Sequence, residues 1–165
     1  MSVVEHPAYR PLAMEEDPDD YRPRSELAIV IDPGASGYPV AENLTVFLER
    51  IAPGDRIPDH VHTVDEVLFV DEGAIEVRLH DRSQTVEPGA VVFVPAGMRH
   101  GFRNVGAGTA RIHAVFPARE ISIRYLERNP APGTEGQPPG PPLMIDIREL
   151  LEGDPDRAVR PLHPT

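Results

Sequence analysis

The 165-residue sequence predicts an all-β protein, an antiparallel sandwich or barrel, on two observations. Short segments rich in β-branched and other apolar residues recur along the chain, and turn signals built from Pro, Gly or both separate most of them. No helical periodicity intervenes between these segments, and the one helix candidate comes after all of them.

The expected strands follow one another through the central part of the chain. In order they are Leu27–Ile31, Leu44–Ile51, Glu66–Val70, Ala74–Leu79, Gln84–Val86, Ala90–Val94, Thr109–Phe116 and Ile121–Leu126. The turn signals between them lie at Pro33-Gly34, Pro53-Gly54, Glu72-Gly73, Pro88-Gly89, Ala96-Gly97 and Gly106–Gly108.

Two of these strands are apolar on both faces. In Ala74–Leu79 apolar and polar residues alternate, as expected for a strand with one face in water. Residues 67–70 and 91–94 do not alternate, which is unexpected in an antiparallel sheet with one solvated face. We therefore expect the second face to be covered by the N-terminal arm, the C-terminal tail or a second subunit, and we predict a homodimer.

Composition divides the chain into one barrel and two flanks. Residues 1–26 are polar, acidic and proline-containing, and predict an N-terminal arm with little regular structure. Residues 27–127 hold the expected barrel. Residues 128–165 form a Pro/Gly-rich tail that carries the helix candidate, Ile145–Leu151, which Asp146 could cap and Gly153 could end.

Charge and missing residue types exclude several classes of function. The net charge of −11 argues against a nucleic-acid partner. The chain has no Cys, which removes disulfides and thiolate sites, and every basic residue is Arg, which removes Schiff-base chemistry. The N-terminal residues do not read as a signal peptide and no stretch has the length of a membrane span, so we expect a cytoplasmic protein without a membrane partner.

His60-Val61-His62 is the first candidate for chemistry. On a strand, residues two apart point to the same face, so both imidazoles can reach one point. Glu66 follows four residues later, at the start of the next apolar strand. Two imidazoles and one carboxylate from adjacent strands suit a first-row divalent metal, although a His-x-His pair can also be two solvated side chains.

Two spaced patterns surround these residues. The first reads G-x5-H-x-H-x3-E-x6-G from Gly54 to Gly73, and the second reads G-x5-P-x-G-x2-H-x3-N from Gly89 to Asn104. Both spacings, and their order, resemble the two sequence motifs of the cupin superfamily over residues 54–104. Independently of that resemblance, the glycines fall at turns, where a positive φ or a close approach favours this residue.

The resemblance implies an antiparallel jelly-roll (cupin) barrel with a metal in its mouth. The implied ligands are His60, His62 and Glu66 from the first motif and His100 from the second. The expected cofactor is one divalent transition metal, which could be Fe, Mn, Ni, Zn, Co or Cu, since a donor set of nitrogen and oxygen suits all six. Four protein ligands leave one or two coordination positions open.

Further pocket residues follow from strand parity. Leu68 and Val70 share the parity of Glu66, and Phe102 shares that of His100, so these three predict an apolar wall for the substrate pocket. His113 lies in the strand after the second motif and is a candidate catalytic acid or base if it faces inward. The alternative for His113 is a place on the surface or at the edge of the core.

The expected function is that of a metalloenzyme acting on a small organic molecule. Cupins with this ligand set include dioxygenases, decarboxylases and isomerases, and we favour dioxygenase-type oxygen chemistry because mixed His/Glu ligation with open positions supports it. The alternative is a non-enzymic module that binds a small ligand or senses the metal. A structural or storage role fits least, because all four ligands are present.

Overall fold

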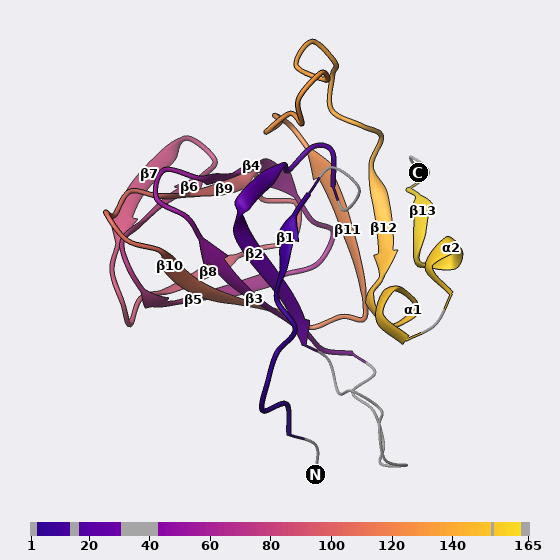
Figure 1. The fold of residues 1–165 in the computed structure, drawn as a ribbon, viewed down its shortest axis with the longest axis horizontal. Coiled ribbons are helices and arrows are strands. Elements are labelled where there is room, and N and C mark those ends of the chain that lie inside the picture. The colour runs from indigo at the N-terminus through magenta and orange to yellow at the C-terminus, as the bar shows by residue number, and fades with distance from the viewer. Residues whose placement is uncertain (1–2, 14–16, 31–42, 153, 163–165) are drawn as a thin grey trace.

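Two antiparallel sheets face each other in the computed structural model, which describes residues 3–13, 17–30, 43–152 and 154–162 (Figure 1). Together they form the expected jelly-roll barrel. In spatial order, the six-stranded sheet consists of β1 (Arg10–Leu12), β2 (Arg22–Val30), β3 (Thr45–Ile51), β10 (Ala110–Phe116), β5 (Glu66–Glu72) and β8 (Val91–Val94). The seven-stranded sheet consists of β13 (Val159–Pro161), β12 (Leu143–Asp146), β11 (Glu120–Tyr125), β4 (Arg56–Val61), β9 (His100–Asn104), β6 (Ile75–Leu79) and β7 (Arg82–Val86).

The core fills the space between the sheets. Its largest fully buried side chains include Phe102, Phe116, Ile51 and Ile112. Burial alternates along β5 and β10, so each strand sends one set of side chains inward. Gly73 shows why one turn requires glycine: its φ is 86°, and an added Cβ would lie 2.8 Å from the Cβ of Ala110.

The N-terminal residues are more regular than expected. The strand predicted to begin at Leu27 begins at Arg22, because residues 22–27 pair with the additional strand β1. The preceding segment is tied to the opposite end of the chain. Asp20 forms a parallel bridge with Asn129, and Arg128 forms a buried ion pair with Asp19. Polar contacts between the two flanks therefore give structure to sequence that lacks apolar periodicity.

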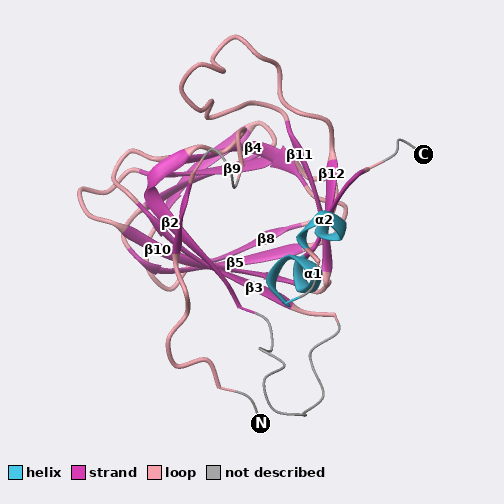
Figure 2. Ribbon diagram, turned by 45° about the vertical axis from the view of Figure 1, so that its right-hand side comes forward, coloured by secondary structure: helices cyan, strands magenta, loops and turns pink. Residues whose placement is uncertain are grey.

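The C-terminal residues return to the barrel before the helix starts. Leu143–Asp146 pair with β11 as strand β12, so α1 (Ile147–Glu152) begins two residues later than predicted. Asp146 caps it as expected, since its Oδ1 accepts hydrogen bonds from the N–H groups of Arg148 and Glu149. A second short helix, α2 (Pro155–Ala158), lies beside it (Figure 2). Neither helix has the length or apolar character to cross a bilayer, and these are the helices of the described residues.

Two expected features, the turn at Pro33-Gly34 and the helix end at Gly153, lie outside the described residues. Of the two strands predicted to be apolar on both faces, β8 leaves its second face open to solvent, whereas Val67 and Phe69 on that face of β5 are half-buried. Phe93 is 69% exposed and Val91 is 44% exposed, and both lie on β8, the edge strand of the six-stranded sheet.

Candidate metal centre

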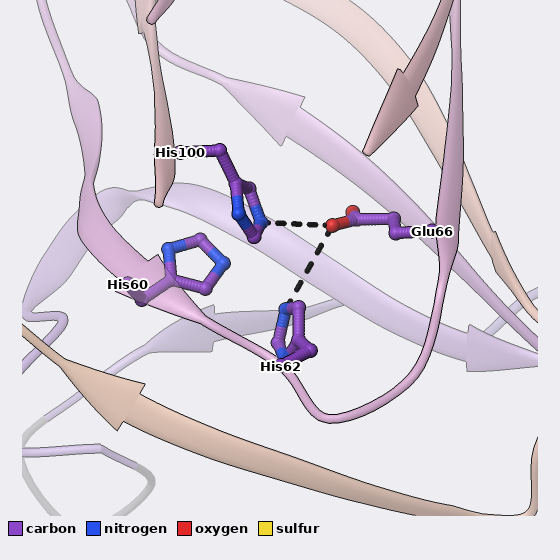
Figure 3. A group of neighbouring side chains, drawn as sticks. All are labelled: His60, His62, Glu66 and His100. Carbon is purple, nitrogen blue, oxygen red and sulfur yellow. Dashed lines mark ion pairs between the residues drawn. The ribbon is translucent and has the colours of Figure 1, made fainter. Parts of the chain in front are cut away.

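The four predicted ligands converge at one point in the barrel (Figure 3). His60 lies in β4, and His62 follows directly after that strand. Glu66 and His100 are the first residues of β5 and β9, and the pairing of β4 with β9 sets His100 opposite His60. One ligand atom from each of the four residues lies within 4.8 Å of the others, and all four side chains are buried.

Hydrogen bonds fix the tautomer of each imidazole. The Nδ1 atoms of His60, His62 and His100 lie 2.7, 2.5 and 2.8 Å from backbone carbonyl oxygens. A carbonyl oxygen only accepts, so each Nδ1 carries the proton and donates it. Each Nε2 is left with a free lone pair, which is the form in which histidine binds a metal.

Two buried atoms of the cluster have no hydrogen-bond partner. They are Oε2 of Glu66 and Nε2 of His100, which lie 2.9 Å apart, and Nε2 of His62 lies 3.8 Å from the same carboxylate oxygen. Buried polar atoms are normally satisfied, so two that face each other without a bond indicate a missing partner. A cation among three lone-pair nitrogens and one carboxylate would satisfy all of them, so the residues fit one divalent transition metal.

Burial favours the neutral form of the His60 and His62 imidazoles. The pKa of His60 lies well below its ordinary value, mainly because burial penalises the charged form and also because His100 and His62 are close by. Burial likewise lowers the pKa of His62, although Glu66 opposes the shift. Near neutral pH these rings are therefore already in the metal-binding form.

A cavity of about 180 Å³ lies beside the cluster. His60, His62 and Glu66 contribute to its wall, and much of the remaining wall is apolar. Of the residues predicted to form the pocket, Leu68 and Phe102 line this cavity, whereas Val70 is buried in the core. Segments from both flanks complete the wall, namely β1 on one side and β12 with α1 on the other.

His113 occupies a different part of the molecule. Its Nδ1 lies 2.8 Å from Oδ2 of Asp71, and its ring stacks on Phe69 with the centroids 4.6 Å apart. Phe69 is its register partner on β5, on the face of the sheet opposite Leu68. The side chain is therefore on the outer face of the sheet and is absent from the lining of the 180 Å³ cavity.

The cavity also has a polar wall that the sequence analysis missed. It is formed by Asp17, Asp20, Arg22, Glu49 and Tyr125. Arg22 is buried and ion-paired with Asp20 at 2.7 Å and with Glu49 at 3.1 Å. One signal was available, because Glu49 shares the inward parity of Thr45 and Ile51 in its strand, and a carboxylate at an inward position is unusual.

Comparison with known proteins agrees with this geometry. Residues 47–116 match the family described as the cupin domain. Protein SchB of Streptomyces halstedii is 30% identical over 104 residues, which cover 62% of this chain and 73% of SchB. The tetracenomycin polyketide synthase protein TcmJ of Streptomyces glaucescens is 30% identical over 95 residues, which cover 54% of this chain and 62% of TcmJ.

Solved structures share the fold at lower sequence identity. The polyketide cyclase RemF from Streptomyces resistomycificus superposes with a TM-score of 0.56 at 22% identity, over 83% of this chain and 86% of RemF. A cupin-superfamily sugar phosphate isomerase from Silicibacter pomeroyi superposes with a TM-score of 0.60 at 19% identity, over 88% of this chain and 87% of that protein. These likenesses concern the fold, which hosts different reactions.

Proposed function

We propose that this chain, which belongs to the cupin superfamily, is a metalloenzyme. Its substrate in this proposal is a small, largely apolar organic molecule that bears a carbonyl group. The observation that carries the proposal is the position of the four-residue cluster. Its unsatisfied atoms, Glu66 Oε2 and His100 Nε2, lie in a cluster that borders a largely apolar cavity. An ion held there would be within reach of a bound small molecule.

When bound, a divalent ion supplies Lewis-acid polarisation of a substrate oxygen. The chain contributes the rest of the site. The three backbone carbonyls hold the imidazoles in one orientation. The apolar wall, including Phe47, Phe102 and Phe116, excludes water and suits a flat ring system. The polar wall opposite offers groups that can move a proton.

The substrate class is supported by one relative. TcmJ is named as a polyketide synthase protein and is 30% identical over the matched residues. Polyketide chains carry several carbonyl groups and cyclise to flat aromatic rings, which fits both the donor set and the shape of the wall. We therefore propose a polyketide-derived substrate and a reaction that begins at a carbon next to a carbonyl.

Dioxygenase-type oxygen chemistry is the second candidate. It is favoured by the four-ligand cluster, which leaves one or two positions open on a five- or six-coordinate ion beside an apolar wall. In that case the substrate class could be the same, and the reaction would consume O₂. A non-enzymic binding module would bind the metal and a ligand without converting the ligand to a product.

One experiment separates these functions. The metal-loaded protein is incubated in D₂O with 1-tetralone, a flat bicyclic ketone, and NMR follows exchange of the hydrogens next to the carbonyl while an electrode follows O₂. Metal-dependent exchange without O₂ uptake supports the carbonyl chemistry. Metal-dependent O₂ uptake supports the second candidate. Protein that binds the metal but accelerates neither process overturns both enzymatic functions.

A further inference from the structure

We propose that Asp17 is the group that transfers the proton in this pocket and that Tyr125 positions it. The inference rests on the proposed function, because it assigns the acid–base group of the same pocket. It concerns a residue of the N-terminal flank, outside the two motifs and outside the metal cluster.

The carboxyl group of Asp17 is held in one place on the cavity wall. Its Oδ2 accepts a hydrogen bond of 2.6 Å from the hydroxyl of Tyr125 on β11. Its Oδ1 accepts from the backbone N–H groups of Asp19 at 2.9 Å and Asp20 at 3.2 Å. Donors from two separate parts of the chain therefore fix both oxygens, as expected of a group that must meet a substrate in one orientation.

Three other carboxyl groups line the cavity, and each has another role. Asp20 and Glu49 are paired with the buried guanidinium of Arg22. Glu66 belongs to the metal cluster. The hydrogen bonds to Asp17 come instead from a phenol and two amides, which are neutral. Pairing with a guanidinium lowers a carboxyl pKa and occupies its oxygens, although burial still raises the pKa of Glu49. Neutral donors oppose protonation less, so the carboxylate of Asp17 accepts a proton more readily.

The electrostatic surroundings agree with this assignment. Burial raises the pKa of Asp17 above its ordinary value, the Tyr125 hydrogen bond opposes the rise, and the charges of Asp20 and Asp19 add to it. Arg22 and Arg10 are the cations on the same cavity wall. A base whose pKa lies closer to the working pH transfers protons more effectively.

The step is a proton transfer that needs no oxidant. The ionised carboxylate of Asp17 takes a proton from the carbon next to the substrate carbonyl. The C–H bond breaks and an O–H bond forms on Asp17. The C–H electron pair forms a carbon–carbon double bond, while the π pair of the carbonyl group moves onto its oxygen. The carboxylic acid then returns its proton to the substrate or product, and the carboxylate is regenerated.

The test uses Asp17→Asn, Tyr125→Phe and the matched control Asp71→Asn in the full chain, all loaded with the same metal. Asp71 is half-exposed on the outer face of the barrel and lies away from the cavity. Metal content and far-UV circular dichroism are compared first. Deuterium exchange into 1-tetralone is then followed across a pH series, and ¹³C NMR of aspartate-labelled protein gives the pKa of Asp17 directly.

We expect Asp17→Asn to lower exchange by about 100-fold at unchanged metal content, a loss typical of removing a general base. Asp71→Asn should exchange at the wild-type rate. Tyr125→Phe removes the hydrogen bond that lowers the pKa of Asp17, so its pH profile and the Asp17 resonance should both move to higher pH. A purely structural role for Tyr125 would not shift the two together.

Two results would overturn the inference alone and leave the proposed function standing. One is an Asp17→Asn variant that exchanges deuterium into 1-tetralone at the wild-type rate. The other is an Asp17 pKa at or below its ordinary value. If the wild-type protein does not accelerate deuterium exchange into 1-tetralone above the rate in buffer alone, the proposed carbonyl chemistry and this inference are overturned together.

Discussion

Nε2 of His100 and Oε2 of Glu66 lie 2.9 Å apart, both are buried, and neither makes a hydrogen bond. In an apolar interior such a pair is costly unless a third partner satisfies both atoms. This geometry therefore predicts that replacing either residue weakens metal binding.

His100→Ala should lose most of the metal while the barrel stays folded. The variant deletes a nitrogen donor, whereas the core between the sheets is apolar and independent of the ion. Mass spectrometry gives the metal stoichiometry, and far-UV circular dichroism gives the fold. Retention of a full metal equivalent by this variant would show that the ligand assignment is wrong.

Glu66→Gln should bind the same metal more weakly, because it removes the anionic donor and keeps the shape of the side chain. We expect a loss of affinity of about tenfold or more, which corresponds to about 1.4 kcal/mol. Competition with a fluorescent chelator measures the affinity. Asp65→Gln is a suitable control, since Asp65 is an exposed neighbour outside the cluster. Equal affinity of Glu66→Gln and wild type would remove Glu66 from the ligand set.

Metal affinity and apo-protein stability should both fall in acid. Metal binding needs neutral imidazoles, so affinity should decline as the pH falls through the lowered pKa values of His60 and His62, where protons begin to compete for these rings. The pKa values of His60 and His62 are lowered by folding, so the unfolded chain binds more protons than the native one as the pH falls. By linkage, this contribution to stability is present above the unfolded histidine pKa and is lost below it. Calorimetry and urea melts from pH 8 to pH 5 check both trends, and a melting midpoint that rises in this direction would contradict the second.

Asp17→Asn should stabilise the protein above the pKa of Asp17 and have little effect below it. Folding raises the pKa of this carboxyl, so holding it ionised in the native state costs free energy that appears as the pH rises through the folded value. The single side-chain oxygen of asparagine can still accept the two backbone hydrogen bonds, its amide N–H can donate to the hydroxyl of Tyr125, and the side chain carries no charge. Thermal melts at pH 8 and pH 4 test this prediction. The same variant should also have lost exchange activity, because stability gained at an active site usually costs function.

His113→Ala should leave the metal content near the wild-type level. The imidazole stacks on Phe69 at the outer face of the sheet, away from the 180 Å³ cavity. Metal stoichiometry measured beside His100→Ala provides the comparison. A large loss of metal from His113→Ala would contradict the placement of this side chain.

We expect two copies of the chain to pair through the exposed face of β8 and β5. Phe93 is 69% exposed there beside Val91, and the half-buried Val67 and Phe69 continue the apolar surface. Phe93→Glu should weaken dimerisation by at least about tenfold, whereas Val105→Glu, at an exposed residue of a loop, should not. Light scattering at low micromolar concentration gives the mass, and a wild-type species of only 18.2 kDa would contradict a dimer.

The antiparallel strands and the set of His60, His62 and Glu66 could be predicted from strand period, turn residues and local spacing. The jelly-roll topology and the place of His100 in the cluster followed from the resemblance of the two motifs to the cupin superfamily. The polar wall could not be found in this way. Asp17 meets Tyr125 across 108 positions of the chain, and Arg22 meets Glu49 across 27. Strand parity places Glu49 inward, but no local pattern identifies Arg22 as its partner or pairs Asp17 with Tyr125, since these contacts depend on where the N-terminal flank folds back.

The ion pair between Asp19 and Arg128 joins the two flanks that complete the cavity. The ligand cluster comes from β4, β5 and β9 and their ends, whereas much of the opposite wall comes from sequence before residue 30 and after residue 120. The ligand cluster and much of the cavity wall are thus encoded in separate stretches of the chain, so the wall can change without altering the four ligand residues. Because the flanks are joined by this ion pair and by the bridge between Asp20 and Asn129, replacing one flank alone would break these contacts. A chimaera designed to change the substrate would need to exchange both flanks together.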